Sequence, residues 1–305
     1  MPVRSSGIDI VTEYQESSVT RRTVRFQIGG SVIRVSGEYR GKVVVITGAG
    51  SGIGRATALR FARDKAKVHL CDVSAAALDK VRSEVEGLGA PVETHVVDVS
   101  DPAAVRRLAE SVFEIDAGVD VLHNNAGVGV SGPVDRLTVE DWQRVIGINL
   151  LGVAYGVHYF VPRMLSQGRP AHIVNTASSA GLIPLPTMVP YTASKFGVVG
   201  LSLALDAELR PRGIRVTALC PGVINTPIAT TTPQRGELDP AKGAKLFQMI
   251  GASPDKVADA VVRSLTSTST IVTVPKLHVE PLWLVHRISP TAYRGVSKLL
   301  QKFTG

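Results

Sequence analysis

Apolar residues from Lys42 onward follow two alternating spacings. Short apolar runs such as "KVVVITG", "KVHLCDV" and "IRVTALCPG" have the length and the β-branched content of buried strands. Between them lie segments with helical apolar spacing, such as "IGRATALRFARDKA" and "PAAVRRLAESVFEI", the latter opened by Pro102. Strands that alternate with helices of ten or more residues predict an α/β protein whose parallel sheet is covered by helices on both faces.

The other segments complete this rhythm. Further strands are predicted at "PVETHVVDVS", "VDVLHNNAG", "AHIVNTASS" and "STIVTV", which gives a mostly parallel seven-stranded sheet. Long helical regions are expected across residues 138–166 and from about Met188 to Arg210. The helix at "AAALDKVRSEVEGLG" is expected to end at Gly87 and Gly89.

Both ends of the chain differ from this pattern, so we predict a domain over residues 41–275 with two additions. Residues 1–40 include "TVRFQIGGSVIRVSGEY", which alternates around Gly29 and Gly30 and predicts a hairpin or an irregular arm. Residues 276–305 form a tail that mixes Leu282, Trp283 and Ile288 with basic residues.

A glycine-rich turn, "TGAGSGIG", lies between the first strand of this rhythm and the helix after it. It does not fit G-x-G-x-x-G but does fit T-G-x-x-x-G-x-G, with Thr47, Gly48, Gly52 and Gly54. The first-turn amides of a helix have no intrahelical acceptors and favour an anion. In a doubly wound (Rossmann) domain such a turn holds the pyrophosphate of a dinucleotide, although a purely structural turn would show the same glycines.

Two aspartates end the next two strands. Asp72 follows Gly54 by 18 residues, and a carboxylate there can accept hydrogen bonds from an adenosine ribose and would repel a 2′-phosphate. No arginine adjoins Asp72, so NAD is favoured over NADP; the alternative is a solvated loop aspartate. Asp98 could meet an adenine ring or cap the helix that begins at Pro102.

Several motifs in order resemble the short-chain dehydrogenase/reductase (SDR) family of NAD(P)-dependent oxidoreductases, from about Gly41 to Val274. "NNAG" ends the fourth strand, "YTASK" supplies Tyr-x-x-x-Lys, and Ser178 precedes Tyr191 by 13 residues, as is usual in the family. "GINLLG" and "PGVINT" match two further family segments. The resemblance implies catalytic roles for Asn149, Ser178, Tyr191 and Lys195. It implies cofactor contacts for Gly48, Ser51, Gly52, Ile53, Gly54, Asp72, Asp98, Val99, Asn125, Ala126, Gly127, Tyr191, Lys195, Pro221, Gly222, Val223 and Thr226.

Tyr191 and Lys195 are four residues apart on an expected helix, so they share one face. A tyrosine with a pKa of about 10 is a poor base at neutral pH, but a nearby ammonium and an oxidised nicotinamide would favour its phenolate. Tyr191 is therefore the expected acid/base, with Ser178 holding the same substrate oxygen. The resemblance also implies that Lys195 binds the nicotinamide ribose and that Asn149 holds a water.

Each of these assignments has a structural alternative. Ser179 adjoins Ser178, so the catalytic hydroxyl could be one residue away. Asn149 could satisfy a local bend in its helix, and Thr226 could be an ordinary loop hydroxyl. His123 lies on an expected buried strand and is interpreted as structural.

Composition narrows the remaining possibilities. Hydrophobic content of 44% with 20% charge is ordinary for a globular enzyme. With no uninterrupted apolar run of about 18 residues and no secretory signal, we expect no spanning helix and a cytoplasmic location. Cys71 and Cys220 end apolar runs and are predicted to be buried thiols, and no metal site is expected.

The net charge of +8 does not indicate a nucleic-acid partner. The expected catalytic domain has no dense Lys/Arg run, and no stacking aromatics are arrayed with the basic residues of the tail. That tail carries five basic residues and Glu280, a net charge of +4. It could contact an anionic membrane surface or a lipid substrate, but packing over the substrate cleft or a neighbouring subunit is the favoured interpretation.

We expect the substrate to be recognised by residues from Ile228 to about Ile250 and near Leu182 to Val189. "GLIPLPTMV" has no charge, which favours a lipophilic secondary alcohol or ketone. The predicted function is hydride transfer between NAD(H) and such a compound, in a homodimer or homotetramer as in the family. The alternatives are an NADPH-preferring carbonyl reductase and a non-catalytic dinucleotide-binding regulatory or scaffold protein.

Overall fold

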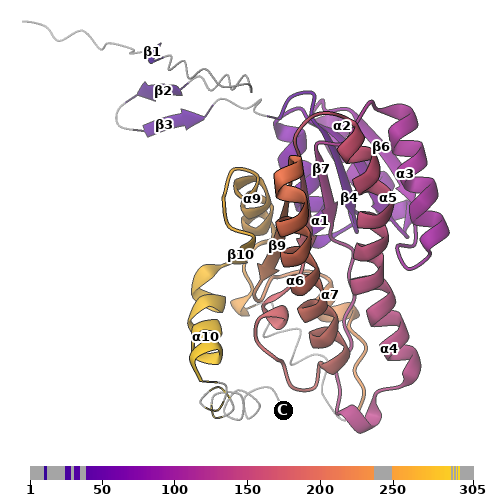
Figure 1. Cartoon of the computed structure of the whole chain (residues 1–305), viewed down its shortest axis with the longest axis vertical. Coiled ribbons are helices and arrows are strands. Elements are labelled where there is room, and N and C mark those ends of the chain that lie inside the picture. The colour runs from indigo at the N-terminus through magenta and orange to yellow at the C-terminus, as the bar shows by residue number, and fades with distance from the viewer. Residues whose placement is uncertain are drawn as a thin grey trace, which may run out of the picture.

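The computed structural model describes residues 10–11, 25–28, 31–34, 39–236 and 249–289, together with 291, 293 and 295. Its main element is a seven-stranded sheet in the order β10-β9-β8-β7-β4-β5-β6 (Figure 1). All six neighbouring pairs are parallel. The strands are β4 (Val43–Thr47), β5 (Lys67–Asp72), β6 (Val92–Val96), β7 (Val121–Asn124), β8 (Ala171–Thr176), β9 (Ile214–Pro221) and β10 (Ile271–Val274). The doubly wound α/β fold predicted from the sequence is therefore confirmed.

Helices connect these strands and cover both faces of the sheet, as Figure 1 shows. One face carries α1 (Gly52–Arg63), α2 (Ala75–Gly87) and α9 (Pro254–Ser264), whose apolar residues form one core cluster with the sheet. The other carries α3 (Pro102–Ile115), α5 (Gly152–Ser166) and α6 (Val189–Leu209). Further helices in the described part of the chain are α4 (Val139–Ile146), α7 (Ile228–Thr231) and α10 (Lys276–Ile288), with short turns η1 (Val134–Arg136), η2 (Gly147–Leu151), η3 (Ser179–Gly181) and η4 (Arg210–Arg212).

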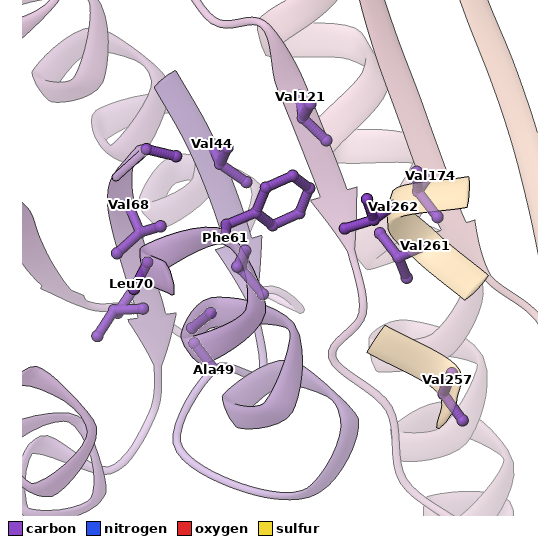
Figure 2. Close-up of a cluster of buried hydrophobic side chains, with 14 of the residues drawn as sticks. Val44, Ala49, Phe61, Val68, Leu70, Val121, Val174, Val257, Val261 and Val262 are labelled. Carbon is purple, nitrogen blue, oxygen red and sulfur yellow. The ribbon is translucent and has the colours of Figure 1, made fainter. Parts of the chain in front are cut away.

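Strand β4 shows why the strands read as continuous apolar runs. Val44 and Ile46 belong to the cluster under α1, whereas Val43 and Val45 belong to the cluster on the opposite face. Successive side chains of a strand point to opposite faces, so a strand covered on both sides must be apolar at every position. In Figure 2 the ring of Phe61 from α1 lies beside the side chains of the central strands.

The additions outside the sheet are of two kinds. Strands β2 (Arg25–Ile28) and β3 (Ser31–Arg34) pair antiparallel as the predicted hairpin, with β1 (Ile10–Val11) beside β2. In the tail, α10 follows β10 directly. Residues 237–248, part of the expected substrate-recognition segment, lie outside the described residues.

The helical stretch Val139–Ser166 is long and apolar enough, by length and composition, to cross a membrane. It comprises α4, η2 and α5, and Phe160 and Met164 of α5 are buried in the core cluster with α3. A core helix passes the same test of length and composition, so the finding is weak evidence for a membrane span.

Two local expectations meet different outcomes. Cys71 and Cys220 are buried free thiols, as predicted, and burial raises the pKa of Cys220 to about 12. The suggestion that Asp98 caps α3 is wrong. Asp101 caps that helix by accepting a hydrogen bond from Ala103 N at 2.9 Å, while Asp98 accepts from Ser100 N at 2.8 Å in a local turn.

Two buried histidines make stability depend on pH. His123 pairs through Nε2 with Thr176 Oγ1 at 2.9 Å and His172 with Thr217 Oγ1 at 2.8 Å, and burial lowers the pKa of each histidine to about 3. An unfolded histidine takes up a proton near pH 6.5, so the unfolded state gains protons that the folded state does not. We expect the free energy of unfolding to fall by about 2 kcal/mol for each of these residues between pH 7 and pH 5.

Urea unfolding at the two pH values measures this loss. His95 has its pKa lowered to about 4 and also contributes, so the double variant His123→Gln/His172→Gln should lose part of the pH dependence and not all of it. A double variant that loses as much stability on acidification as the wild type would contradict the assignment.

Candidate active site

The carboxyl ends of β4 and β7 form the centre of the candidate site. The chain runs from β4 to β5 and β6 and then returns to β7 on the other side of β4, which makes this the switch point where doubly wound folds bind ligands. The Asn125 amide donates to Thr47 O at 3.0 Å and Gly48 O at 3.3 Å. Thr47 Oγ1 accepts from the backbone N–H groups of Asn125 (2.9 Å) and Ala126 (3.1 Å). The "NNAG" segment is thereby fixed against the glycine turn.

The glycine turn itself requires residues without side chains. Gly48 and Gly52 have φ angles of +64° and +50°, where other L-residues are strained. A Cβ on Gly54 would collide with the carbonyl oxygen of Gly48. Ser51 is the exposed N-cap of α1 and its side chain makes no capping hydrogen bond, while Ile53 lies in the first turn of the helix. The turn and the first residues of α1 therefore form a cradle. The first backbone amides of the helix have no intrahelical acceptor, and such a site fits a pyrophosphate.

Asp72 lies beside this turn. Its Oδ2 accepts from Gly50 N at 2.9 Å and its Oδ1 from Ser74 N at 3.1 Å. A Cβ on Gly50 would lie 2.9 Å from the same Oδ2, which explains a fourth glycine that the T-G-x-x-x-G-x-G motif does not require. The half-buried carboxylate keeps acceptor capacity beside the cradle, as a ribose hydroxyl would need.

Two other segments with expected cofactor contacts follow the carboxyl ends of β6 and β9. Val99 is buried where β6 leads toward α3, and a Cβ on Gly152 would lie 2.9 Å from it; the neighbouring Asp98 is exposed. On the other side, Pro221 ends β9, and the Val223 carbonyl accepts from Ala252 N at 2.9 Å.

The loop that follows Pro221 covers the start of α1. The Thr226 side chain lies 3.2 Å from the position of a Cβ on Gly52, which places Thr226 over the glycine turn. A Cβ on Gly222 would lie 3.2 Å from His278 and Val279, so this loop also packs against α10.

Asn149 lies in the five-residue π-helical turn η2, which interrupts the helix expected across residues 138–166. Its amide donates to Val128 O (2.9 Å) and Ser194 Oγ (3.1 Å), and its oxygen accepts from Val128 N (2.8 Å). Asn149 does lie in a local irregularity of its helix, but its side chain bonds to Val128 and Ser194 and to no backbone group of that helix. The same turn brings its side chain beside Gly127, whose added Cβ would lie 3.3 Å from Asn149 Oδ1 and 3.5 Å from Lys195 Nζ. Single π turns frequently mark functional sites.

Lys195 and Tyr191 project from one face of α6, as their spacing predicts. Lys195 is 3% exposed, donates to the Thr176 carbonyl at 2.8 Å, and lies 5.6 Å from the centre of the Tyr191 ring. Burial lowers the pKa of Lys195 to about 8. Burial raises the pKa of Tyr191, and a hydrogen bond with Ser178 opposes that rise.

The hydrogen bond between Tyr191 and Ser178 favours Ser178, and not Ser179, as the hydroxyl beside Tyr191. The lowering of the Tyr191 pKa that was expected from the Lys195 ammonium is not found, because burial raises this pKa and the hydrogen bond with Ser178 offsets only part of the rise.

Some contributing residues were not assigned a role from the sequence. The Thr176 carbonyl holds Lys195, and Ser194 Oγ receives the Asn149 amide while donating to Tyr191 O at 2.7 Å. Ser194 lies inside the Tyr-x-x-x-Lys motif, and this position was the one sequence feature that could have indicated its role. A backbone carbonyl such as that of Thr176 leaves no signature in residue identity.

Three loops are joined by backbone hydrogen bonds, and two of them belong to the segments from which substrate recognition is expected. Ser131 N donates to Pro233 O at 3.0 Å, and Gly132 N donates to Thr187 O at 2.7 Å. The Arg235 guanidinium holds the Asp141 carboxylate with two hydrogen bonds of 2.8 and 2.9 Å. The segment after α7 is thus fastened to α4.

The tail packs against the same region. Val279 and Tyr293 are buried in one apolar cluster with Leu182 and Ile183, and Tyr293 Oη donates to Pro184 O at 2.7 Å. This part of the tail therefore packs against the segment near Leu182, from which substrate recognition is expected.

Comparisons with known proteins agree with this geometry. The profile of the short chain dehydrogenase family matches residues 42–236. Probable oxidoreductase EphD of Mycobacterium tuberculosis is 35% identical over 294 residues, which cover 92% of this chain and 48% of EphD. This chain thus spans about half the length of that relative. Cyclohexanol dehydrogenase of an Acinetobacter species is 36% identical, over 78% of this chain and 93% of that protein.

Among solved structures, a short chain dehydrogenase/reductase from Burkholderia phymatum in complex with NAD superposes with a TM-score of 0.75 at 36% identity, over 82% of this chain and 94% of that one. The matched family profile, the relatives and the arrangement of the motifs lead to one conclusion. The chain belongs to the short-chain dehydrogenase/reductase family of oxidoreductases.

Proposed function

We propose that this protein interconverts a lipophilic secondary alcohol and its ketone with NAD(H), using Tyr191 as the acid/base. The observation that carries the proposal is the meeting of Tyr191, Ser178 and Lys195 next to the "NNAG" segment, which is fixed against the glycine turn. A non-catalytic dinucleotide-binding scaffold would need none of these side chains, nor Asn149 in its π turn.

The roles of the side chains follow from their chemistry. When bound, NAD(H) would supply the hydride donor or acceptor. Tyr191 exchanges a proton with the substrate oxygen, and Ser178 holds that oxygen with a hydrogen bond. Because burial raises the pKa of Tyr191, the phenol is protonated at neutral pH and suited to donate its proton in ketone reduction. Alcohol oxidation needs the phenolate and should gain from a higher pH.

The nucleotide cradle supports NAD as the cofactor. Asp72 is held beside the turn by Gly50 N and would meet a 2′-phosphate with like charge. Solved structures similar to this chain include complexes with NAD and others with NADP. The alternative is therefore an NADPH-preferring reductase, and the relative affinities of the protein for NADH and NADPH distinguish the two.

The residues after Ser178 support an apolar substrate. The segment from Gly181 to Val189 has no charged residue, and Leu182 and Ile183 are buried beside the catalytic hydroxyl. One relative is a cyclohexanol dehydrogenase, whose name indicates a compact apolar secondary alcohol.

A homodimer or homotetramer in the cytoplasm remains part of the proposal. Leu151, Phe196 and Leu203, at the junction of η2 with α5 and on α6, are exposed, and burying such residues between copies would be favourable. Sedimentation velocity tests the oligomeric state.

Replacing Tyr191 with Phe should lower kcat/KM for a panel of lipophilic secondary alcohols and ketones by about 10²–10⁴-fold, because the acid/base is lost. The ring remains, so the Kd for NADH, measured by fluorescence titration, should stay near the wild-type value. Intact turnover in this variant would refute the catalytic assignment, and tight NADH binding without turnover in the wild type would favour the scaffold.

Replacing Asp72 with Asn should weaken NADH binding by about 10- to 100-fold, because a charged acceptor is lost, and should weaken NADPH binding less. Asp79→Asn, at an exposed carboxylate of α2, is the matched control and should change neither Kd. Equal weakening of NADH and NADPH would show that Asp72 only supports the loop.

Replacing Arg235 with Gln should raise KM for the alcohol severalfold, because the segment after α7 loses its attachment to α4, and should leave the NADH Kd unchanged. The hydrogen bonds from Arg235 lower the pKa of Asp141 to about 2, so the pair stays charged at any assay pH above about 4. Arg144→Gln, at an exposed arginine of α4, is the control. An unchanged KM for Arg235→Gln would show that this ion pair does not contribute to substrate binding.

A further inference from the structure

Helix α10 has apolar residues on two opposite sides. The inner side carries Val279, which is fully buried, with Leu282 and Trp283 packed against the same cluster. In Figure 1, α10 is the yellow helix that follows β10. A helix of a globular domain that packs on one side ordinarily presents polar residues on the other.

The outer side of α10 departs from that rule. Leu277, Leu284 and Ile288 are 83%, 58% and 76% exposed. Their spacings of seven and four residues place them on one face of the helix, and the exposed Pro281 and Val285 adjoin it. We call the three residues Leu277, Leu284 and Ile288 the outer face.

Cationic groups flank the outer face. Lys276 and Arg287 are exposed, and the Arg287 guanidinium lies 5.3 Å from the centre of the Trp283 ring. The acidic residue of this helix, Glu280, accepts a hydrogen bond from the Thr273 hydroxyl at 2.7 Å and forms a 4.0 Å ion pair with Lys276. Glu280 therefore offsets the charge of that lysine but not of Arg287. The sequence after α10 adds Arg294, Lys298 and Lys302 and no acidic residue. Among the described residues, the outer face is thus bordered by Lys276 and Arg287.

An apolar face bordered by cations favours some binding partners over others. A second copy of this chain paired through the outer face would bring two sets of cations together, which is unfavourable. An anionic lipid surface accepts the leucine and isoleucine side chains into its acyl boundary and the lysine and arginine charges among its headgroups. We propose that α10 is a membrane-contact helix that binds anionic bilayers through its outer face.

The position of the helix relates this surface to the candidate active site. The inner side of α10 packs against Leu182 and Ile183, which follow Ser178, and Val279 lies beside Gly222. Contact with a bilayer would therefore bring the loops around Ser178 close to the lipid. The lipid-binding proposal itself does not depend on the substrate or the cofactor.

Vesicle flotation of the full chain tests the proposal in the absence of substrate and cofactor. The protein should float with vesicles of phosphatidylcholine and phosphatidylglycerol and bind phosphatidylcholine vesicles much less. The double variant Leu284→Asp/Ile288→Asp should bind the anionic vesicles at least about tenfold more weakly, since two apolar side chains no longer enter the bilayer. Val139→Asp makes the same kind of change at a 66% exposed apolar residue of α4 and should bind like the wild type.

Three results would overturn the proposal. They are failure of the wild type to float with anionic vesicles, equal flotation of the double variant, and dissociation of a lipid-free oligomer by the double variant, which would assign the outer face to a second copy. Thermal unfolding followed by circular dichroism checks that the variants are folded. If they are not, loss of wild-type binding in high salt supports the proposal, and binding that salt leaves unchanged overturns it.

Discussion

The rest of the site depends on the hydrogen bonds of the Asn125 side-chain amide. Its amide nitrogen holds the carbonyls of Thr47 and Gly48 at the end of β4, and its oxygen accepts from Thr176 Oγ1 at 3.2 Å at the end of β8. The Thr176 carbonyl in turn receives the ammonium of Lys195. One amide therefore fixes the glycine turn, which would hold the nucleotide, relative to Lys195, which lies beside Tyr191.

A buried ammonium is unfavourable unless it is solvated by the protein. Lys195 has the Thr176 carbonyl and the face of the Tyr191 ring, yet its pKa still falls to about 8. Close packing holds it there: a Cβ on Gly181 would lie 2.5 Å from the Lys195 carbonyl, so η3, which begins next to Ser178, lies directly against α6. The separation of serine, tyrosine and lysine is thus set by backbone contact between two elements.

The strands and the motif residues could be predicted because both leave a direct signature in the sequence. Strands covered on two faces are continuously apolar. The glycine turn and "NNAG" stand at the carboxyl ends of β4 and β7, while Tyr191 and Lys195 keep helical spacing on α6. The π turn at Asn149 could not be predicted, because nothing in "GINLLG" distinguishes it from an ordinary helical turn. Capping was misassigned for a similar reason: Asp98 and Asp101 both precede Pro102, and only the backbone geometry selects Asp101. The hydrogen bond that places Lys195 uses a carbonyl that every residue has.

The tail shows more clearly what amino-acid composition cannot predict. Its mixture of apolar and basic residues fitted both packing and lipid contact, because composition does not say which side of a helix a residue occupies. The structure assigns Val279 and Trp283 to the packed side and Leu284 and Ile288 to the exposed side. Tyr293, just beyond α10, holds the Pro184 carbonyl, while the start of the helix lies against Gly222. The tail therefore touches both loops that border the candidate site, and whatever binds its exposed side is separated from those loops by the width of one helix.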